Sequence, residues 1–153
     1  MSKFLTKFIA TLFFVGYFPK APGTLASLVI LVIAWFLLPM GLQAGLIVCV
    51  IAIILSLWSS SKAEELLGKD NRRIVIDETA GMLVSIFLVA KSVNLYLAAF
   101  FLFRFFDVIK PFPIRKLEKL KSGWGVTLDD VAAGVCANIV LQLLLYLKNV
   151  LQI

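Results

Sequence analysis

The stretch Thr127-Leu128-Asp129-Asp130-Val131-Ala132-Ala133-Gly134 places two adjacent carboxylates at the start of an apolar run that continues to about residue 147. The chain around it has 153 residues, of which 61% are hydrophobic, and its mean hydropathy is +1.01. Because soluble domains are only about half apolar, a single membrane-embedded domain over residues 1–153 is predicted. Ionisable groups inside a membrane are expensive and usually functional. The two aspartates therefore predict a polar site at one end of a membrane helix.

Five apolar runs predict an all-α fold, a polytopic bundle of about five transmembrane helices. They cover approximately residues 24–39, 42–58, 75–90, 94–109 and 128–147. Most are short compared with the roughly 20 residues that cross a bilayer. The turn sequences Pro39-Met40-Gly41 and Lys91-Ser92-Val93-Asn94 predict antiparallel neighbours. Ahead of the bundle, which spans 19–153, lysines interrupt the apolar residues of 1–18 and predict a helix that lies in the membrane interface.

The basic residues predict the orientation of this bundle. With five crossings, the loops around residues 18–24, 59–74 and 110–127 share one side. That side carries every Lys and Arg of the chain except Lys91 and Lys148. Cytoplasmic loops of membrane proteins have such an excess of positive charge, so these loops are expected to be cytoplasmic. The net charge of +6 then indicates an anionic membrane surface as the partner, and no nucleic acid.

The same topology brings acidic residues from three helices to one level on the cytoplasmic side: Asp77, Glu78, Asp107, Asp129 and Asp130. Each has a simpler explanation when taken alone. The two adjacent pairs suit helix N-termini, and Asp107 has basic neighbours at i−3 and i+3. Their convergence favours a metal site instead. Because the chain has no histidine, an all-oxygen site for Mg²⁺, or for Mn²⁺, is predicted.

Two further features suit a phosphate group. Gly23 and Thr24 begin an apolar run after a Pro-rich break, with Ser27 one turn later, and helix N-termini of this kind bind anions. Ordinary helix capping is the alternative explanation. Several cations near the acids are predicted to contact phosphate oxygens: Lys20, Arg72, Arg73, Arg104 and Lys110.

Four ordered blocks resemble the phosphatidylglycerophosphatase A family over about residues 16–142. They are Pro19-x-x-Pro22-Gly23-Thr24-x-x-Ser27, Ile74-Val75-x-Asp77-Glu78-x-x-Gly81-Met82, Phe103-Arg104-x-x-Asp107-x-x-Lys110-Pro111-x-Pro113-Ile114 and Gly123-x-Gly125-x-x-x-Asp129-Asp130-x-x-Ala133-Gly134. Ala26 departs from the family pattern, which has glycine before Ser27. The resemblance implies a Mg²⁺-dependent enzyme of the bacterial inner membrane that hydrolyses phosphatidylglycerophosphate to phosphatidylglycerol and phosphate, a step of phospholipid biosynthesis.

The resemblance also suggests roles for the candidate residues. The five acids named above would hold one or two Mg²⁺ ions, with Asp77 among the catalytic residues and Asp129 or Asp130 as the base. Arg104 and Lys110 would hold the phosphate, while Thr24 and nearby amides would position it.

Three other classes of membrane protein are alternatives. A divalent-cation transporter or channel would use the acids as an ion site, but such acids are expected near the bilayer midplane. A CDP-alcohol phosphatidyltransferase would carry a D-G-x₂-A-R-x₈-G-x₃-D-x₃-D signature, which the chain lacks. A structural membrane protein would leave the convergence of the acids unexplained.

Overall fold

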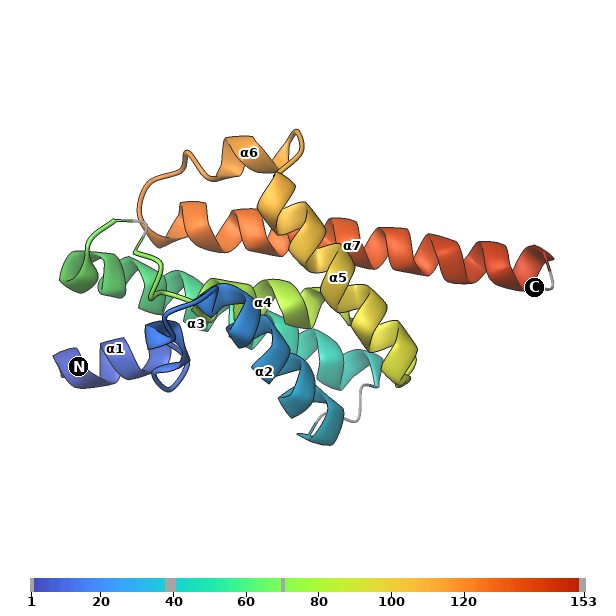
Figure 1. Ribbon diagram of the computed structural model, residues 1–153, viewed down its shortest axis with the longest axis horizontal. Helices are drawn as coiled ribbons and strands as arrows, with labels where there is room; N and C mark the ends of the chain where they lie inside the picture. The colour runs from blue at the N-terminus through green and yellow to red at the C-terminus, as the bar shows by residue number, and fades with distance from the viewer. Residues whose placement is uncertain (1, 38–40, 70, 152–153) are drawn as a thin grey trace.

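The computed structural model describes residues 2–37, 41–69 and 71–151, and within these ranges the chain is helical, without strands (Figure 1). The all-α prediction is confirmed. The elements in chain order are α1 (Lys3–Ala10), the 3-10 helix η1 (Val15–Tyr17), α2 (Pro22–Leu37), α3 (Leu42–Leu67), α4 (Ile76–Ser85), α5 (Val93–Ile109), α6 (Ile114–Leu117) and α7 (Gly123–Leu151). Of the predicted turn before α3, Pro39 and Met40 lie outside the described residues.

Helix α4 is the centre of the bundle and contacts α2, α3, α5 and α7 (Figure 1). Its close approach to α7 depends on two glycines. A Cβ atom at Gly134 would overlap the carbonyl oxygen of Gly81, and one at Gly81 would overlap both the Phe103 ring and the carbonyl oxygen of Asp130. Small residues let membrane helices pack backbone to backbone. The glycine contact between the two helices therefore brings Asp130 next to α4.

A buried hydrogen bond fixes the first turns of α7 against α3. The hydroxyl groups of Ser56 and Thr127 lie 2.8 Å apart, and both side chains are fully buried. Thr127 precedes the two aspartates of α7 by two and three residues. This contact therefore sets the position from which their side chains leave the helix.

The structure offers two helices that are long and apolar enough to cross a membrane, within the described ranges. They are α3, with 26 residues, and α7, with 29; in their most apolar windows only 22% and 28% of the residues are buried. Such outward-facing apolar surface suits a helix in lipid better than the core helix of a soluble protein. The topology of about five spans is not confirmed. Helices α2 and α5 have 16 and 17 residues.

Helix α4 is the clearest departure from the predicted spans. The apolar run continues to residue 90, but the helix has 10 residues and ends at Ser85. At 1.5 Å per residue it is about 15 Å long, half of the roughly 30 Å hydrocarbon core. The amide of Asn138 on α7 donates hydrogen bonds to the carbonyl oxygens of Ser85 and Phe87, at 3.0 and 2.7 Å, and the amide of Gln142 donates to that of Leu88 at 3.1 Å. Carbonyl groups without helical partners in an apolar environment need such donors. Helix α7 therefore stabilises the termination of α4 at Ser85.

Replacing Asn138 with Leu is expected to lower the free energy of unfolding by about 1–3 kcal/mol, because two carbonyl oxygens lose their donor. Gln142→Leu is the matched control: it removes one, more exposed, hydrogen bond and should cost less. Thermal or denaturant unfolding in detergent micelles measures both. An equal or larger loss for the Gln142 variant would contradict the capping role of Asn138.

The N-terminal segment forms a shorter helix than the predicted one, over Lys3–Ala10, followed by a tight turn. The aromatic rings of Phe4, Phe8, Phe13 and Phe14 pack against one another, with centroids 4.8–6.1 Å apart. Phe4, Phe13 and Phe14 remain exposed. Exposed aromatic side chains gather where membranes meet water, and the interfacial position of this segment stays a prediction.

Candidate active site

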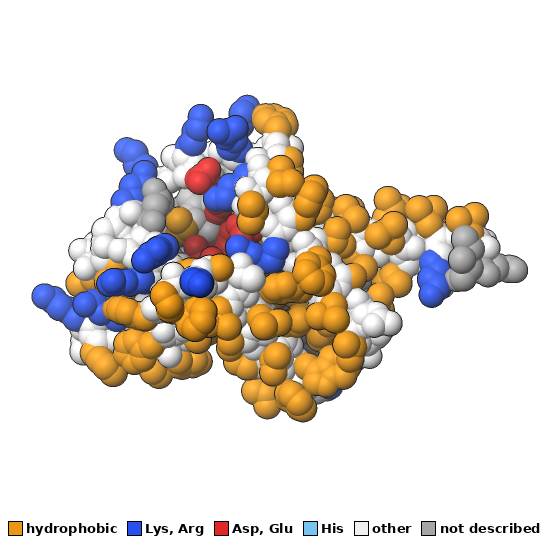
Figure 2. Space-filling model, in the orientation of Figure 1, with side chains coloured by type: hydrophobic (Ala, Val, Ile, Leu, Met, Phe, Trp, Pro, Cys, Tyr) orange, Lys and Arg blue, Asp and Glu red, His pale blue; other side chains and the backbone are white. Residues whose placement is uncertain are grey.

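A cavity of about 330 Å³ lies where the N-terminal ends of α2, α4 and α7 meet the C-terminal end of α5. Figure 2 shows acidic side chains inside this hollow and Lys and Arg side chains around it, while apolar side chains cover the surface away from it. The charged residues that line it are Arg72, Asp77, Glu78, Arg104, Lys110, Glu118 and Asp129. The ends of four helices thus form one polar pocket at the edge of an apolar bundle.

Three of the five predicted acidic ligands form a tight group. Asp77 and Glu78, in the first turn of α4, and Asp130, in α7, each offer a carboxylate oxygen, and these oxygens lie within 4.8 Å of one another. Asp77 is 8% exposed and Asp130 is 4% exposed. The group, named here the carboxylate trio, exists because the glycine contact between α4 and α7 brings these two helix faces together.

The trio is electrostatically costly as it stands. Burial raises the pKa of Asp77 well above its usual value, and the neighbouring charge of Glu78 raises it further. Burial also raises the pKa of Glu78, although Arg104 acts in the opposite direction. Oδ1 of Asp77 and Oε2 of Glu78 are buried and have no hydrogen-bond partner among the described residues. Unpartnered buried carboxylate oxygens that repel one another are the donors that a hard divalent cation takes.

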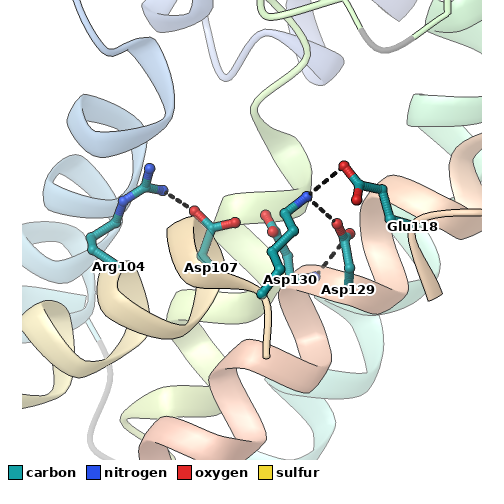
Figure 3. A network of polar contacts seen from close by, with 6 residues as sticks. Arg104, Asp107, Glu118, Asp129 and Asp130 are labelled. Carbon is teal, nitrogen blue, oxygen red and sulfur yellow. Dashed lines mark hydrogen bonds and ion pairs between the residues drawn. The ribbon is translucent and has the colours of Figure 1, made fainter. Parts of the chain in front are cut away.

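The other two predicted ligands are each paired with a cation (Figure 3). Asp107 Oδ2 lies 2.8 Å from Arg104 Nη1, an ion pair by distance that lacks the alignment of a hydrogen bond. Asp129 Oδ2 accepts a hydrogen bond from Lys110 Nζ at 2.6 Å. Ion pairing of Asp107 with Arg104 is therefore observed, as the simpler sequence explanation expected. Whether Asp107 and Asp129 also bind a metal stays a prediction.

Lys110 also forms an ion pair with Glu118, a further residue of the cavity lining that was not among the predicted site residues. The Lys110 ammonium lies 3.1 Å from Glu118 Oε1 as well as next to Asp129. Burial alone would lower the pKa of Lys110, but its hydrogen bonds and ion pairs with these two carboxylates outweigh that effect and raise it. Lys110 is therefore a fixed positive charge. The only sequence signal for Glu118 was that it is an isolated acid in the basic loop before α7.

The predicted phosphate-binding residues divide into two groups. Gly23 and Thr24 line the cavity, and the Gly23 backbone lies so close to Glu78 that a Cβ there would overlap its carboxylate. The first amides of a helix have no partner within the helix, so this terminus presents donors to the site. Lys20 and Ser27 are not part of the lining. Ser27 is buried and donates to the carbonyl oxygen of Gly23 at 2.9 Å.

Comparison with known proteins gives one family and several relatives. The family model of phosphatidylglycerophosphatase A matches residues 8–145. A Haemophilus influenzae protein named phosphatidylglycerophosphatase A is 38% identical over 135 residues, 86% of this chain and 83% of its own length. The Escherichia coli protein of that name is 29% identical over 123 residues, 78% and 72% of the two lengths. A Bacteroides thetaiotaomicron protein named "Putative phosphatidylinositol-3-phosphatase" is 38% identical over 146 residues, 90% and 92% of the two lengths. No solved structure matches the chain.

Proposed function

Because this chain belongs to the phosphatidylglycerophosphatase A family and is a phosphatase, we propose that it hydrolyses phosphatidylglycerophosphate to phosphatidylglycerol and inorganic phosphate, as a step of phospholipid biosynthesis. The observation that carries the proposal is the carboxylate trio together with two of the cations that line the cavity, Arg104 and Lys110. A phosphomonoester brings negative charge, and the cavity offers positive charge and free amides to receive it.

The apolar surfaces of α3 and α7 make this a membrane-associated protein. We propose the bacterial inner membrane as its location, with the cavity on the cytoplasmic side. The concentration of basic residues around the mouth of the cavity (Figure 2) supports this orientation, because cytoplasmic surfaces of membrane proteins are the more basic ones.

The trio fits Mg²⁺, with Mn²⁺ as the substitute, because its three donors are carboxylate oxygens, two of them without another partner. Asp77, Glu78 and Asp130 would hold the ion. Bound there, it would supply a Lewis acid for the phosphoryl oxygens and acidify a nearby water. Asp107 and Asp129 stay candidates for further ligands.

The chain's own residues supply the rest of the proposed mechanism. Arg104 and Lys110 bind phosphoryl oxygens, and Thr24 with the first amides of α2 orients the group. Exposed Arg72 is a further cation of the lining. Asp129 lines the cavity outside the trio, so its carboxylate accepts the proton of the attacking water. The phosphorus–oxygen ester bond then breaks, inorganic phosphate leaves, and the lipid oxygen takes up the proton held by Asp129 to become the alcohol. The transporter alternative has no support, because the matched family and the named relatives are phosphatases.

Phosphate release from phosphatidylglycerophosphate in mixed micelles tests the proposal, with Mg²⁺ and with EDTA, and with phosphatidylinositol 3-phosphate as the competing substrate. We expect Mg²⁺-dependent release that is faster from phosphatidylglycerophosphate. Faster release from the inositol lipid would show that this is the preferred headgroup. The protein would still be a lipid phosphatase. No release from either lipid by folded protein would refute the proposed function.

A further inference from the structure

A second cavity lies between α2 and α5, at the ends of these helices that are remote from the carboxylate trio. Its volume is about 240 Å³ and its lining is almost entirely apolar. Leu31, Val32, Trp35 and Phe36 contribute from the C-terminal half of α2, and Val93, Tyr96 and Leu97 from the first turns of α5. Nothing in the proposed chemistry uses this space, which we refer to as the apolar cavity.

One face of α2 connects the two cavities. Thr24, Leu28, Val32 and Phe36 follow one another at four-residue steps, so they form one row along the helix. Thr24 lines the active-site cavity, whereas Val32 and Phe36 line the apolar cavity. The middle of this row is open, since Leu28 is 41% exposed and Val32 is 50% exposed.

Helix α5 supplies the opposite side in the reverse direction (Figure 1). Leu97 lines the apolar cavity and Arg104, seven residues later, lines the active-site cavity. Phe101 lies between them on the same side of the helix, four residues after Leu97 and three before Arg104, and is 67% exposed. Exposed apolar side chains of both helices therefore lie between the active-site cavity and the apolar cavity, and we refer to them as the α2–α5 seam.

The seam extends over most of the length of α2. Thr24 and Trp35 are 11 residues apart, which is about 16 Å along a helix. The far end is closed by aromatic contacts: the rings of Trp35 and Tyr96 lie 5.5 Å apart, edge to face, and the Lys91 ammonium lies 5.3 Å from the centre of the Trp35 ring.

We propose that the α2–α5 seam binds an acyl chain of the lipid whose phosphate occupies the active-site cavity, with Trp35 at the end of the chain. This inference rests on the proposed function and deepens it. The seam selects for a phosphomonoester that carries a membrane-embedded chain over a water-soluble phosphomonoester with the same headgroup. The position of its side chains between the two cavities distinguishes this seam from the other exposed apolar surface of the protein.

Filling the seam tests the inference. Val32→Trp places a large ring in its middle, and Val50→Trp is the matched control, because Val50 is 46% exposed on α3 and lines neither cavity. Two substrates are compared, long-chain phosphatidylglycerophosphate in mixed micelles and its deacylated, water-soluble headgroup. Val32→Trp should lower kcat/KM for the long-chain lipid about tenfold, the effect of roughly two methylene groups that lose their burial. Its kcat/KM for the deacylated headgroup should not change, and Val50→Trp should alter neither value.

Leu97→Trp fills the seam from the other helix and should reproduce the selective loss, so the test does not depend on one variant folding well. An equal fall for both substrates, or no difference between the seam variants and Val50→Trp, would overturn the inference. These outcomes differ from failure of the proposed function, in which the wild-type protein would release no phosphate from the long-chain lipid at all.

Discussion

Asp130→Asn is expected to reduce kcat for phosphate release on the order of a thousandfold, since one of the carboxylates proposed to hold the metal is lost, and with it several kcal/mol of charge stabilisation. Asn has nearly the shape of Asp, so the packing of α7 against α4 should persist. Asp130 is 4% exposed and belongs to the trio. Among the described residues, Asp77 and Glu78 are the two carboxylates that share this group with it.

The same variant should be no less stable than the wild type when both are free of metal, because it removes one of three carboxylates that repel one another. Mg²⁺ should raise the unfolding temperature of the wild type, and that of the variant by clearly less. Glu65→Gln is the control: it removes one acidic charge from an exposed ion pair with Lys62 and should change neither quantity. Wild-type kcat in Asp130→Asn would show that the trio is not the catalytic centre.

Gly134→Ala should both destabilise the protein and inactivate it. A single methyl group there would overlap the Gly81 carbonyl oxygen, which is backbone and can move only with α4. Overpacking of this kind costs about 1–3 kcal/mol. Separating α4 from α7 also separates Asp77 and Glu78 from Asp130, and displacements of about 1 Å in an active site can cost about a hundredfold in rate.

The matched control for Gly134→Ala is Gly41→Ala, since a Cβ at Gly41 meets no atom within 4 Å. Both changes add one methyl group to a glycine, so they differ mainly in the space available. Unfolding in micelles and phosphate release measure the two expected losses. If Gly134→Ala keeps wild-type stability and rate, the glycine contact does not position the trio.

Helix boundaries were predictable where apolar sequence and tertiary structure agree. The fourth run, predicted over 94–109, is α5 over Val93–Ile109. The second run was predicted to end near residue 58, but α3 continues to Leu67, because a helix does not need an apolar face throughout once it has started. The prediction for the third apolar run, over residues 75–90, departs most from the structure. Helix α4 ends at Ser85, where the Asn138 amide donates a hydrogen bond to the Ser85 carbonyl oxygen. A partner 53 residues away in the sequence cannot be predicted from a local pattern.

The convergence of Asp77, Glu78 and Asp130 was predicted from topology, and the structure brings them together. The different environment of Asp129 could also have been expected. Adjacent residues on an α-helix point about 100° apart at 3.6 residues per turn, so Asp129 and Asp130 cannot face the same point equally. Asp129 instead faces Lys110. The bond from Lys110 to Glu118 depends on the path of the loop before α7, which no periodicity determines.

The shortness of α4 has a consequence for how the protein is made. A helix of 10 residues is about half of what a bilayer crossing needs, so α4 is not expected to enter the membrane as a stable span of its own. The carbonyl oxygens at and just after its end accept hydrogen bonds from side chains of α7, which is synthesised after α2, α3, α4 and α5. Asp77 and Glu78 can thus meet Asp130 only after α7 has been synthesised. A nascent chain interrupted before α7 would hold most of the bundle and no catalytic centre.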